Sequence, residues 1–330
     1  MKWHSFPKVE LHLHLDCSIG YPAASQIDPG ISQEIFERDF VLDQPCKDLA
    51  DFLSKIPRSL NLMQEAHHLQ LVTKELIHQL IKQHVVYAEI RFAPLLHTEK
   101  GLSSREVVSS VLTAMKPSVR DYDLPLGLIL CTLRHFTEKE SLETVHLAHE
   151  FKDKGVVGID LAADEAGFPI TAHRSAFQYA RQNNINRTAH AGEALGPESI
   201  WETLERLQPQ RIGHGVRAIE DPKLVQHLVE SKIHLEVCPG CNVLIGVFPD
   251  LESHSVDRLL KAGISLNINT DGHTLPKSNL NMEYQSLENV FSWGKNEFLK
   301  TNRYAMQAAF TDSATKTRII GQLEHAYGGN

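Results

Sequence analysis

The chain has 330 residues, 42% of them hydrophobic and 22% charged, which is enough apolar material for a large core. The formal net charge of −8 argues against a polyanionic partner such as duplex DNA, which needs a basic face. No apolar run reaches the ~18 residues of a membrane helix, and no apolar secretory segment is visible near the start. Five scattered cysteines suit a reducing compartment better than a disulfide framework. The composition therefore predicts a globular cytoplasmic protein that binds neither nucleic acid nor membranes.

The first predicted strand covers residues 9–16, VELHLHLD, in which apolar and polar residues alternate. Side chains two apart share one face of an extended strand. Leucines therefore occupy one face, and His12 and His14 stand side by side on the other. Neutral imidazole is a common zinc ligand, so this pair is a candidate metal site, although two ordinary strand histidines would give the same pattern.

A regular alternation of helices and strands follows. Residues 48–64 have helical spacing interrupted at Pro57, and could be core or a lid over a pocket. Further strands are predicted at 85–94, 126–133, 156–161, 186–191, 210–212, 233–238 and 264–269. Helices are predicted at 65–83, 103–115, 138–152, 172–183, 197–207, 222–229 and 255–261, with a helical tail over 282–325.

Eight apolar strands separated by helices indicate a parallel sheet covered on its outer face. The count favours a single α/β domain over residues 1–330, a (β/α)8 barrel of the TIM type. The tail would pack on the outside or close the bottom. A doubly wound open sheet would instead carry a glycine-rich phosphate turn after the first strand, and the sequence has none there.

Catalytic groups of such barrels sit at the carboxyl ends of the strands. The residues found there are His12, His14, Asp16, His190, Glu193, His214 and Asp271. Three histidines and a carboxylate suit a divalent metal, with zinc favoured. Glu193 and His214 remain as an acid–base pair, so the set predicts metal-assisted hydrolysis.

Taken together, the motifs resemble those of the adenosine deaminases of the amidohydrolase superfamily, from residue 9 to about residue 294. They are HLHLD at 12–16, DLAADE at 160–165, HAGE at 190–193, RIGHG at 211–215, CPGCN at 238–242 and NTD at 269–271. The resemblance implies a zinc-dependent hydrolase that converts adenosine, and 2'-deoxyadenosine, to inosine and ammonia. The partner it implies is a small-molecule purine nucleoside, and no pattern indicates an oligomeric state.

The resemblance also assigns roles to residues. One zinc ion per chain would be held by His12, His14, His190 and Asp271. Its bound hydroxide would attack purine C6, with Asp271 hydrogen-bonding the attacking oxygen. Glu193 would donate a proton to N1, and His214 would orient and deprotonate the water.

Other positions are assigned to the substrate. Asp16 would meet a ribose hydroxyl, although a helix cap is an alternative for this residue. Ala163 would offer its backbone N–H to N3, in place of the family's glycine. His14 would contact the substrate as well as the metal, and residues 48–64 would form a helical gate.

The sequence departs from the family pattern at two further positions. Gly272 stands where the family has a second aspartate that bonds purine N7, unless His273 or a water replaces it. Cys17 stands where glycine is usual. The preferred substrate could therefore be another 6-aminopurine: adenine, an N6-modified AMP, or a nucleoside with an altered ribose.

A phosphate-bearing substrate would need a cation near the mouth. The candidates are Arg91, Arg134, Arg211 and Lys277. Two other classes of function stay open: a metal-dependent hydrolase acting on a different bond, and a binding protein without turnover. The C-x-x-C at 238–241 ends a late strand, which does not favour a redox site.

Overall fold

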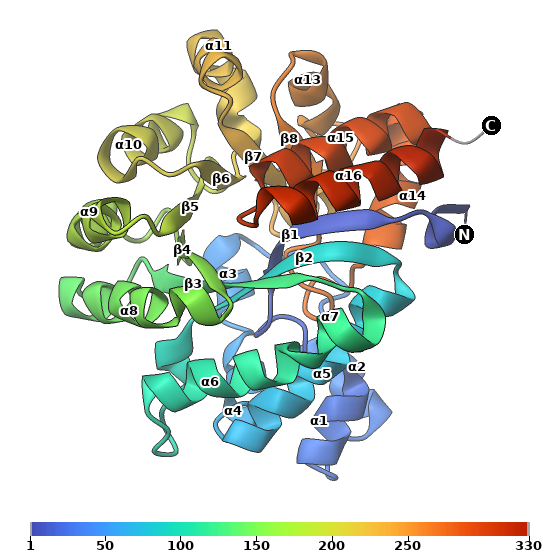
Figure 1. Cartoon of the computed structure of the whole chain (residues 1–330). Helices are drawn as coiled ribbons and strands as arrows, with labels where there is room; N and C mark the ends of the chain where they lie inside the picture. Colours follow the sequence, from blue (N-terminus) through green and yellow to red (C-terminus); the bar gives the residue numbers. More distant parts are fainter. Residues whose placement is uncertain (1, 329–330) are drawn as a thin grey trace.

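The computed structural model describes residues 2–328, in which eight parallel strands follow one another around a barrel in chain order. The strands are β1 Lys8–His14, β2 Val85–Phe92, β3 Leu126–Leu133, β4 Val156–Ala162, β5 Asn186–Ala191, β6 Arg211–His214, β7 His234–Val237 and β8 Leu266–Ile268. The helices surround these strands, and the two ends of the chain lie on the same side of the molecule (Figure 1). The predicted (β/α)8 barrel is confirmed.

The helices before β5 are α1 Tyr21–Ile27, α2 Gln33–Phe40, α3 Leu49–Leu53, α4 Pro57–Leu62, α5 Ala66–Lys82, α6 Ser104–Met115, α7 Pro117–Tyr122, α8 Glu138–Phe151 and α9 Arg174–Gln182. Those after it are α10 Pro197–Leu207, α11 Pro222–Ser231, α12 Pro239–Leu244, α13 Val256–Lys261, α14 Leu280–Phe291, α15 Lys295–Ala308 and α16 Ser313–Gly328. Short 3₁₀ helices are η1 Lys2–Ser5, η2 Pro94–His97, η3 Lys152–Lys154, η4 Ile170–His173 and η5 Val216–Glu220. None of the helices within residues 2–328 has the length and apolar character that a membrane span needs.

The barrel closes where β8 meets β1. The backbone N–H of His14 donates to Asp271 O at 2.8 Å, and that of Asp271 donates to His12 O at 3.1 Å. The Asn269 side-chain oxygen accepts from the N–H of Leu11 at 2.8 Å, in place of a backbone carbonyl. This seam brings Asp271, near the end of the chain's last strand, beside the two histidines of the first.

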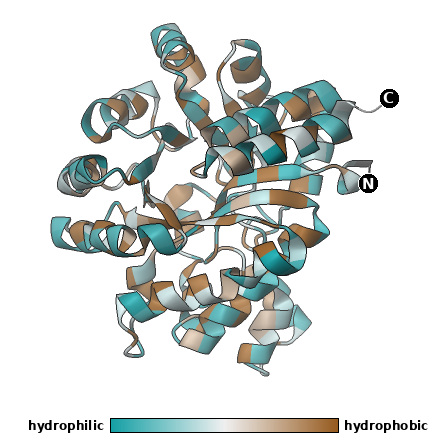
Figure 2. Cartoon of the chain, in the orientation of Figure 1, coloured by the Kyte–Doolittle hydropathy of each residue, from teal (hydrophilic) through white to brown (hydrophobic). Residues whose placement is uncertain are grey.

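Burial follows the predicted alternation. Leu11 and Leu13 lie fully buried in the main apolar cluster, whereas Lys8, Glu10 and His12 are equally buried on the opposite face, inside the barrel. Hydrophobic and hydrophilic residues share the surface of each outer helix (Figure 2), as expected of helices that bury one side against a sheet.

Several elements differ from the sequence predictions in detail. Residues 48–64 form two short helices, α3 and α4, because Pro57 begins the second rather than merely interrupting one. Helices α7 and α12 were not predicted, since each is only six residues long and begins at a proline. Of the tail helices, α15 packs beside β8 and β1 on the outside of the barrel.

Candidate active site

Four histidines and Asp271 meet at the carboxyl ends of the strands. His12 and His14 come from β1, His190 from β5 and His214 from β6. The Nε2 atoms of His12 and His14 lie 3.1 and 3.5 Å from Asp271 Oδ1. His14 Nε2 is also 3.3 Å from His190 Nε2. Ligand atoms of His12, His190, His214 and Asp271 all fall within 4.8 Å of one another, a group in which His214 stands in place of the predicted ligand His14.

The protonation and orientation of two histidine rings suit the binding of a metal ion. His12 Nδ1 lies 2.9 Å from Glu236 Oε2, which fixes its proton on that nitrogen. Its Nε2 is buried and has no hydrogen-bond partner within residues 2–328. His190 Nδ1 lies 3.1 Å from both Asp160 Oδ1 and Leu161 O. Both rings therefore direct an Nε2 lone pair toward the cluster, as a metal ligand would.

Asp271 presents one oxygen to the histidines. The Cys241 thiol donates to its Oδ2 at 3.0 Å, whereas Oδ1 faces the imidazoles. Its backbone lies in the left-handed region with φ 67°, as does that of His214 with φ 59°. Non-glycine residues rarely adopt this conformation, and such strain gathers at functional sites.

Glu193 and His214 form a buried acid–base pair. His214 Nδ1 lies 3.2 Å from Glu193 Oε1, and the Asn242 amide donates to that same oxygen at 3.1 Å. Burial, then the charges of Asp271 and Glu165, raise the pKa of Glu193 well above its usual value. Burial, then the neighbouring His12, lower the pKa of His214. Both shifts favour the uncharged forms, a protonated carboxyl beside a neutral imidazole, and thus a proton donor beside a base.

A second buried carboxylate holds the loop that carries Glu193. Glu165 accepts hydrogen bonds from the backbone N–H groups of residues 192–195, at 2.6 to 3.0 Å, and from the Ser199 hydroxyl at 2.5 Å. One side chain thus satisfies four consecutive amides. This fixes the turn after β5 and the direction in which Glu193 points.

Asp16 lies beside this cluster, and Ala163 comes two residues after Leu161, whose carbonyl His190 contacts. Asp16 Oδ1 is buried without a hydrogen-bond partner in the described part of the chain, 3.8 Å from His14 Nδ1. Burial raises the pKa of Asp16 to about 7. It caps no helix, because α1 begins at Tyr21 with Gly20 as its cap. Ala163 follows β4 in the left-handed region, with φ 77°.

Replacing Ala163 with Gly should stabilise the protein. A left-handed backbone costs an L-residue roughly 1–2 kcal/mol, part of which glycine loses again through its freer unfolded chain. We expect the free energy of unfolding to rise by about 0.5–1 kcal/mol, measured by urea denaturation. A decrease would show that the alanine methyl group contributes packing that outweighs the strain.

Gly272 is packed directly against Cys17. A Cβ atom at residue 272 would lie 2.6 Å from Cys17 Cβ and 2.9 Å from Cys17 O. His273 does not take the place of the missing aspartate, since its Nδ1 lies 2.9 Å from Gln79 Oε1 on helix α5. The departures at 17 and 272 are therefore sterically linked.

The variant Gly272→Asp should lose stability by about 1–3 kcal/mol through overpacking. In the background of Cys17→Gly the same change should cost at least about 0.5 kcal/mol less, because one of the two clashes is gone. Denaturation of the wild type, both single variants and the double variant measures this coupling. If the changes in unfolding free energy of the two single variants simply add up in the double variant, the steric link between residues 17 and 272 is contradicted.

Three of the four cations that were candidates for binding a phosphate lie against acidic side chains instead. Arg91 and Arg211 are fully buried inside the barrel and paired with acidic side chains. Lys277 lies 3.6 Å from Glu37. The fourth, Arg134, donates to the backbone carbonyls of His190 and Phe168 at 2.9 and 3.3 Å, with its Nε left unpaired among residues 2–328.

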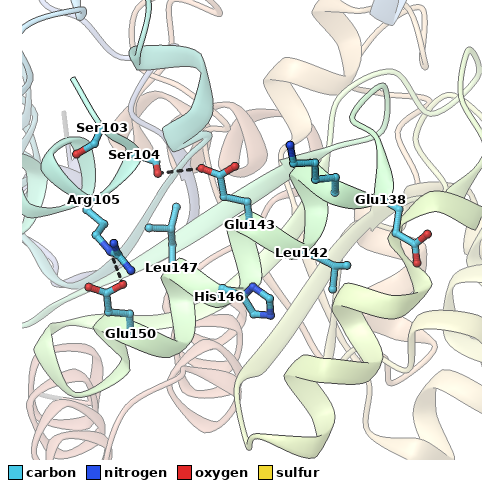
Figure 3. A pocket seen from close by; sticks show the side chains of 10 residues that line it. Ser103, Ser104, Arg105, Glu138, Leu142, Glu143, His146, Leu147 and Glu150 are labelled. Carbon is cyan, nitrogen blue, oxygen red and sulfur yellow. Dashed lines mark hydrogen bonds and ion pairs between the residues drawn. The ribbon is translucent and has the colours of Figure 1, made fainter. Parts of the chain in front are cut away.

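A hollow of about 580 Å³ opens above Glu193. Residues 47–50, at the start of the predicted gate, border it, together with Asp164, Arg217 and Glu220. Arg217 is paired with Glu220 at 2.8 Å. Another hollow, of about 660 Å³, lies between α6 and α8 and is crossed by the Arg105–Glu150 ion pair (Figure 3). Its lining belongs to residues 103–105 and 138–150 and includes none of the residues of the cluster, whereas Glu193 lines the first hollow.

The residues that support the cluster were not predicted from the sequence. Glu236, Asn242 and Glu165 carry no predicted role, although the last two lie in motifs that were recognised. Glu236 could have been found, because a carboxylate in the middle of an apolar strand must face either solvent or a partner inside the barrel.

Comparison with known proteins agrees with this geometry. A family model described as adenosine deaminase matches residues 7–326. An adenosine deaminase of Clostridium acetobutylicum is 32% identical over 327 residues, covering 97% of this chain and 98% of the relative. An Arabidopsis N6-mAMP deaminase structure is 26% identical, with a TM-score of 0.87, over 99% of this chain and 100% of that one. An adenine deaminase from Arthrobacter aurescens, 24% identical, has a TM-score of 0.90 over 98% and 100% of the two chains and supports the fold alone.

Proposed function

The chain belongs to the adenosine deaminase family, and from that premise we propose that it hydrolyses adenosine and 2'-deoxyadenosine to the 6-oxo nucleoside and ammonia. The observation that supports this most directly is the buried pair of Glu193 and His214 beside the histidine and aspartate cluster. A hydrolytic deaminase of purines needs such a donor and such a base beside its metal. A binding protein has no use for them. We also propose that residues 1–330 act as one domain in the cytoplasm, which the five free cysteines support.

We propose that His12, His14, His190 and Asp271 hold one zinc ion per chain. The free Nε2 of His12 and the Oδ1 of Asp271 that faces it are the donors that zinc prefers. A bound zinc ion would lower the pKa of a water molecule from 15.7 to roughly 7. His214 also lies within reach of the cluster, with Nδ1 held by Glu193 and Nε2 left to face the other ligands; we assign that Nε2 to the water rather than to the metal.

The chain's own residues would then move the protons. Glu193, protonated at neutral pH, would donate to purine N1 as water adds at C6. The Nδ1–H of His214 would donate a hydrogen bond to Glu193 Oε1, which leaves Nε2 free to act as the base. Nε2 would accept a proton from that water and pass it to the departing amine. Asp271 would hold the water by a hydrogen bond. The C6–N bond then breaks and the amine leaves as ammonia. The second proton of the water leaves the oxygen as the C6 carbonyl forms and replaces the proton that Glu193 gave to N1.

Three residues are proposed to contact the substrate. Asp16, buried with an unpaired oxygen, would accept a hydrogen bond from a ribose hydroxyl. Ala163 would present its backbone N–H to N3, and His14 would contact the substrate beside the metal. The hollow is bordered by Asp48, Asp164 and Glu220 and also by the cations Lys47 and Arg217, the latter paired with Glu220. The carboxylates still exceed the cations by one, which disfavours a phosphate group there. An N6-modified AMP, the substrate class of the Arabidopsis relative, is the second candidate because that protein resembles the whole chain.

The test is turnover of a substrate panel by the zinc-loaded protein, followed by the ultraviolet change as the 6-amino group becomes 6-oxo. We expect kcat/KM for adenosine to exceed that for N6-methyl-AMP by about tenfold or more, since one like-charge contact is worth at least 1.4 kcal/mol. Faster turnover of N6-methyl-AMP would favour the second candidate. Failure of every 6-aminopurine, adenine included, would overturn the proposal.

A further inference from the structure

Two carboxylates inside the barrel hold the two histidines whose rings are most firmly oriented. Glu236 of β7 lies against His12 Nδ1 at 2.9 Å, and Asp160 of β4 against His190 Nδ1 at 3.1 Å. Each acid fixes which ring nitrogen carries the proton and how the ring is turned. The positions of both acids therefore decide whether the two Nε2 atoms converge on one point.

A single arginine joins these two acids. Arg91 of β2 is fully buried, and its Nη1 donates to Asp160 Oδ2 at 3.0 Å. Its Nη2 donates to Glu236 Oε2 at 2.7 Å and to Leu11 O at 2.6 Å. The Glu236 oxygen that Arg91 contacts is the one that faces His12. The chain of contacts runs from His12 through Glu236, Arg91 and Asp160 to His190, across strands β1, β7, β2, β4 and β5.

The planar guanidinium is suited to this task. Its donors are rigidly spaced, so two carboxylates and a carbonyl that bind it are fixed relative to one another. It also offsets the two negative charges in a place that water does not reach. We propose that Arg91 is a positioning residue for the metal site, which locks the Glu236 and Asp160 carboxylates in place and so determines how tightly the histidines hold the ion.

The inference rests on the metal site of the proposed function and is tested by the affinity for zinc rather than by turnover. Arg91→Lys keeps the charge but replaces the fork by a single ammonium, which cannot reproduce the same three contacts. We expect the Kd for zinc, measured by competition with a chromophoric chelator, to rise about 10- to 100-fold.

Arg211→Lys is the matched control. Arg211 is also buried in the barrel and also contacts Glu236, but through the other oxygen, Oε1, and it pairs with Glu89 rather than Asp160. Its replacement should leave the Kd for zinc within about threefold of the wild type, even if both variants unfold at similar temperatures. Equal weakening in the two variants, or an unchanged Kd in Arg91→Lys, would overturn the proposal.

A second pair of variants serves if Arg91→Lys does not fold. Arg91→Met combined with Asp160→Asn removes one positive and one negative charge together, and is compared with Asp160→Asn alone. The double variant should bind zinc at least about tenfold more weakly, because the Glu236 oxygen that faces His12 has lost Arg91, while Arg211 holds only the other oxygen. Equal affinities would overturn the proposal. If the wild-type chain does not bind zinc, the proposed function is overturned as well. If the wild type binds zinc and the variants have the same Kd for zinc, only this inference is overturned.

Discussion

Replacing Glu193 with Gln should lower kcat for adenosine by about 10²–10⁴, the usual worth of a positioned proton transfer. Glutamine keeps the size of the side chain and an oxygen for the Asn242 amide, which donates to Glu193 Oε1 at 3.1 Å. It cannot give a proton to a ring nitrogen. Stopped-flow or steady-state absorbance at saturating adenosine measures the loss, and KM should change far less than kcat.

The same variant should stay folded, which separates lost chemistry from lost structure. Burial raises the pKa of Glu193, so at neutral pH the folded chain holds a proton that the unfolded chain releases. Such a group favours folding only at acidic pH, and its contribution is lost as the pH rises through the folded pKa. Glutamine has no proton to release, so the free energy of unfolding at pH 7 should not fall. Wild-type kcat should decline as the pH passes above the pKa of Glu193.

Turnover in Glu193→Gln within about threefold of the wild type would contradict the assignment, since the smallest effect expected of a lost proton donor is about 10². His146→Ala is the control for handling and metal content. His146 is an exposed residue of helix α8 in the outer groove of Figure 3. Its removal should leave kcat unchanged.

The barrel could be predicted from sequence because each strand carries its own local signal. Alternation in residues 9–16 and apolar runs such as 126–133 indicate directly which side chains are buried. Because the carboxyl ends of all barrel strands meet at one mouth, the polar residues there can be predicted to lie together even when no distance is known. The position of Asp271 beside His12 follows from closure of the barrel alone, although the two are far apart in the chain.

The contacts behind the site could not be predicted in this way. Whether Arg91 pairs with Asp160, or Glu165 with four amides after β5, depends on the register across the barrel interior, which no local pattern encodes. His273 is turned away from the site because its Nδ1 lies 2.9 Å from Oε1 of Gln79, a residue of helix α5. Packing against Cys17 likewise explains Gly272, but only once both loops are placed.

Removing the metal should have the largest effect of all. Dialysis against a strong chelator should reduce turnover by at least about 10⁴, because free water has a pKa of 15.7 instead of roughly 7 and so supplies far less hydroxide. One equivalent of zinc should restore the activity. Loss of the ion should also lower the melting temperature, since a ligand present at 1,000 times its Kd stabilises the folded state by about 4 kcal/mol.

The variant His190→Ala should lose the metal, and with it turnover, even without treatment with a chelator. It deletes the imidazole that lies 3.3 Å from His14 and contacts Asp160 Oδ1, while Arg91 still holds the other Asp160 oxygen. Metal analysis should find less than one zinc per chain after dialysis, and added zinc should not restore turnover as it does for the wild type. A chelated wild type that keeps its full activity, or a His190→Ala variant that keeps both zinc and turnover, would contradict a hydrolytic centre built on His12, His14, His190 and Asp271.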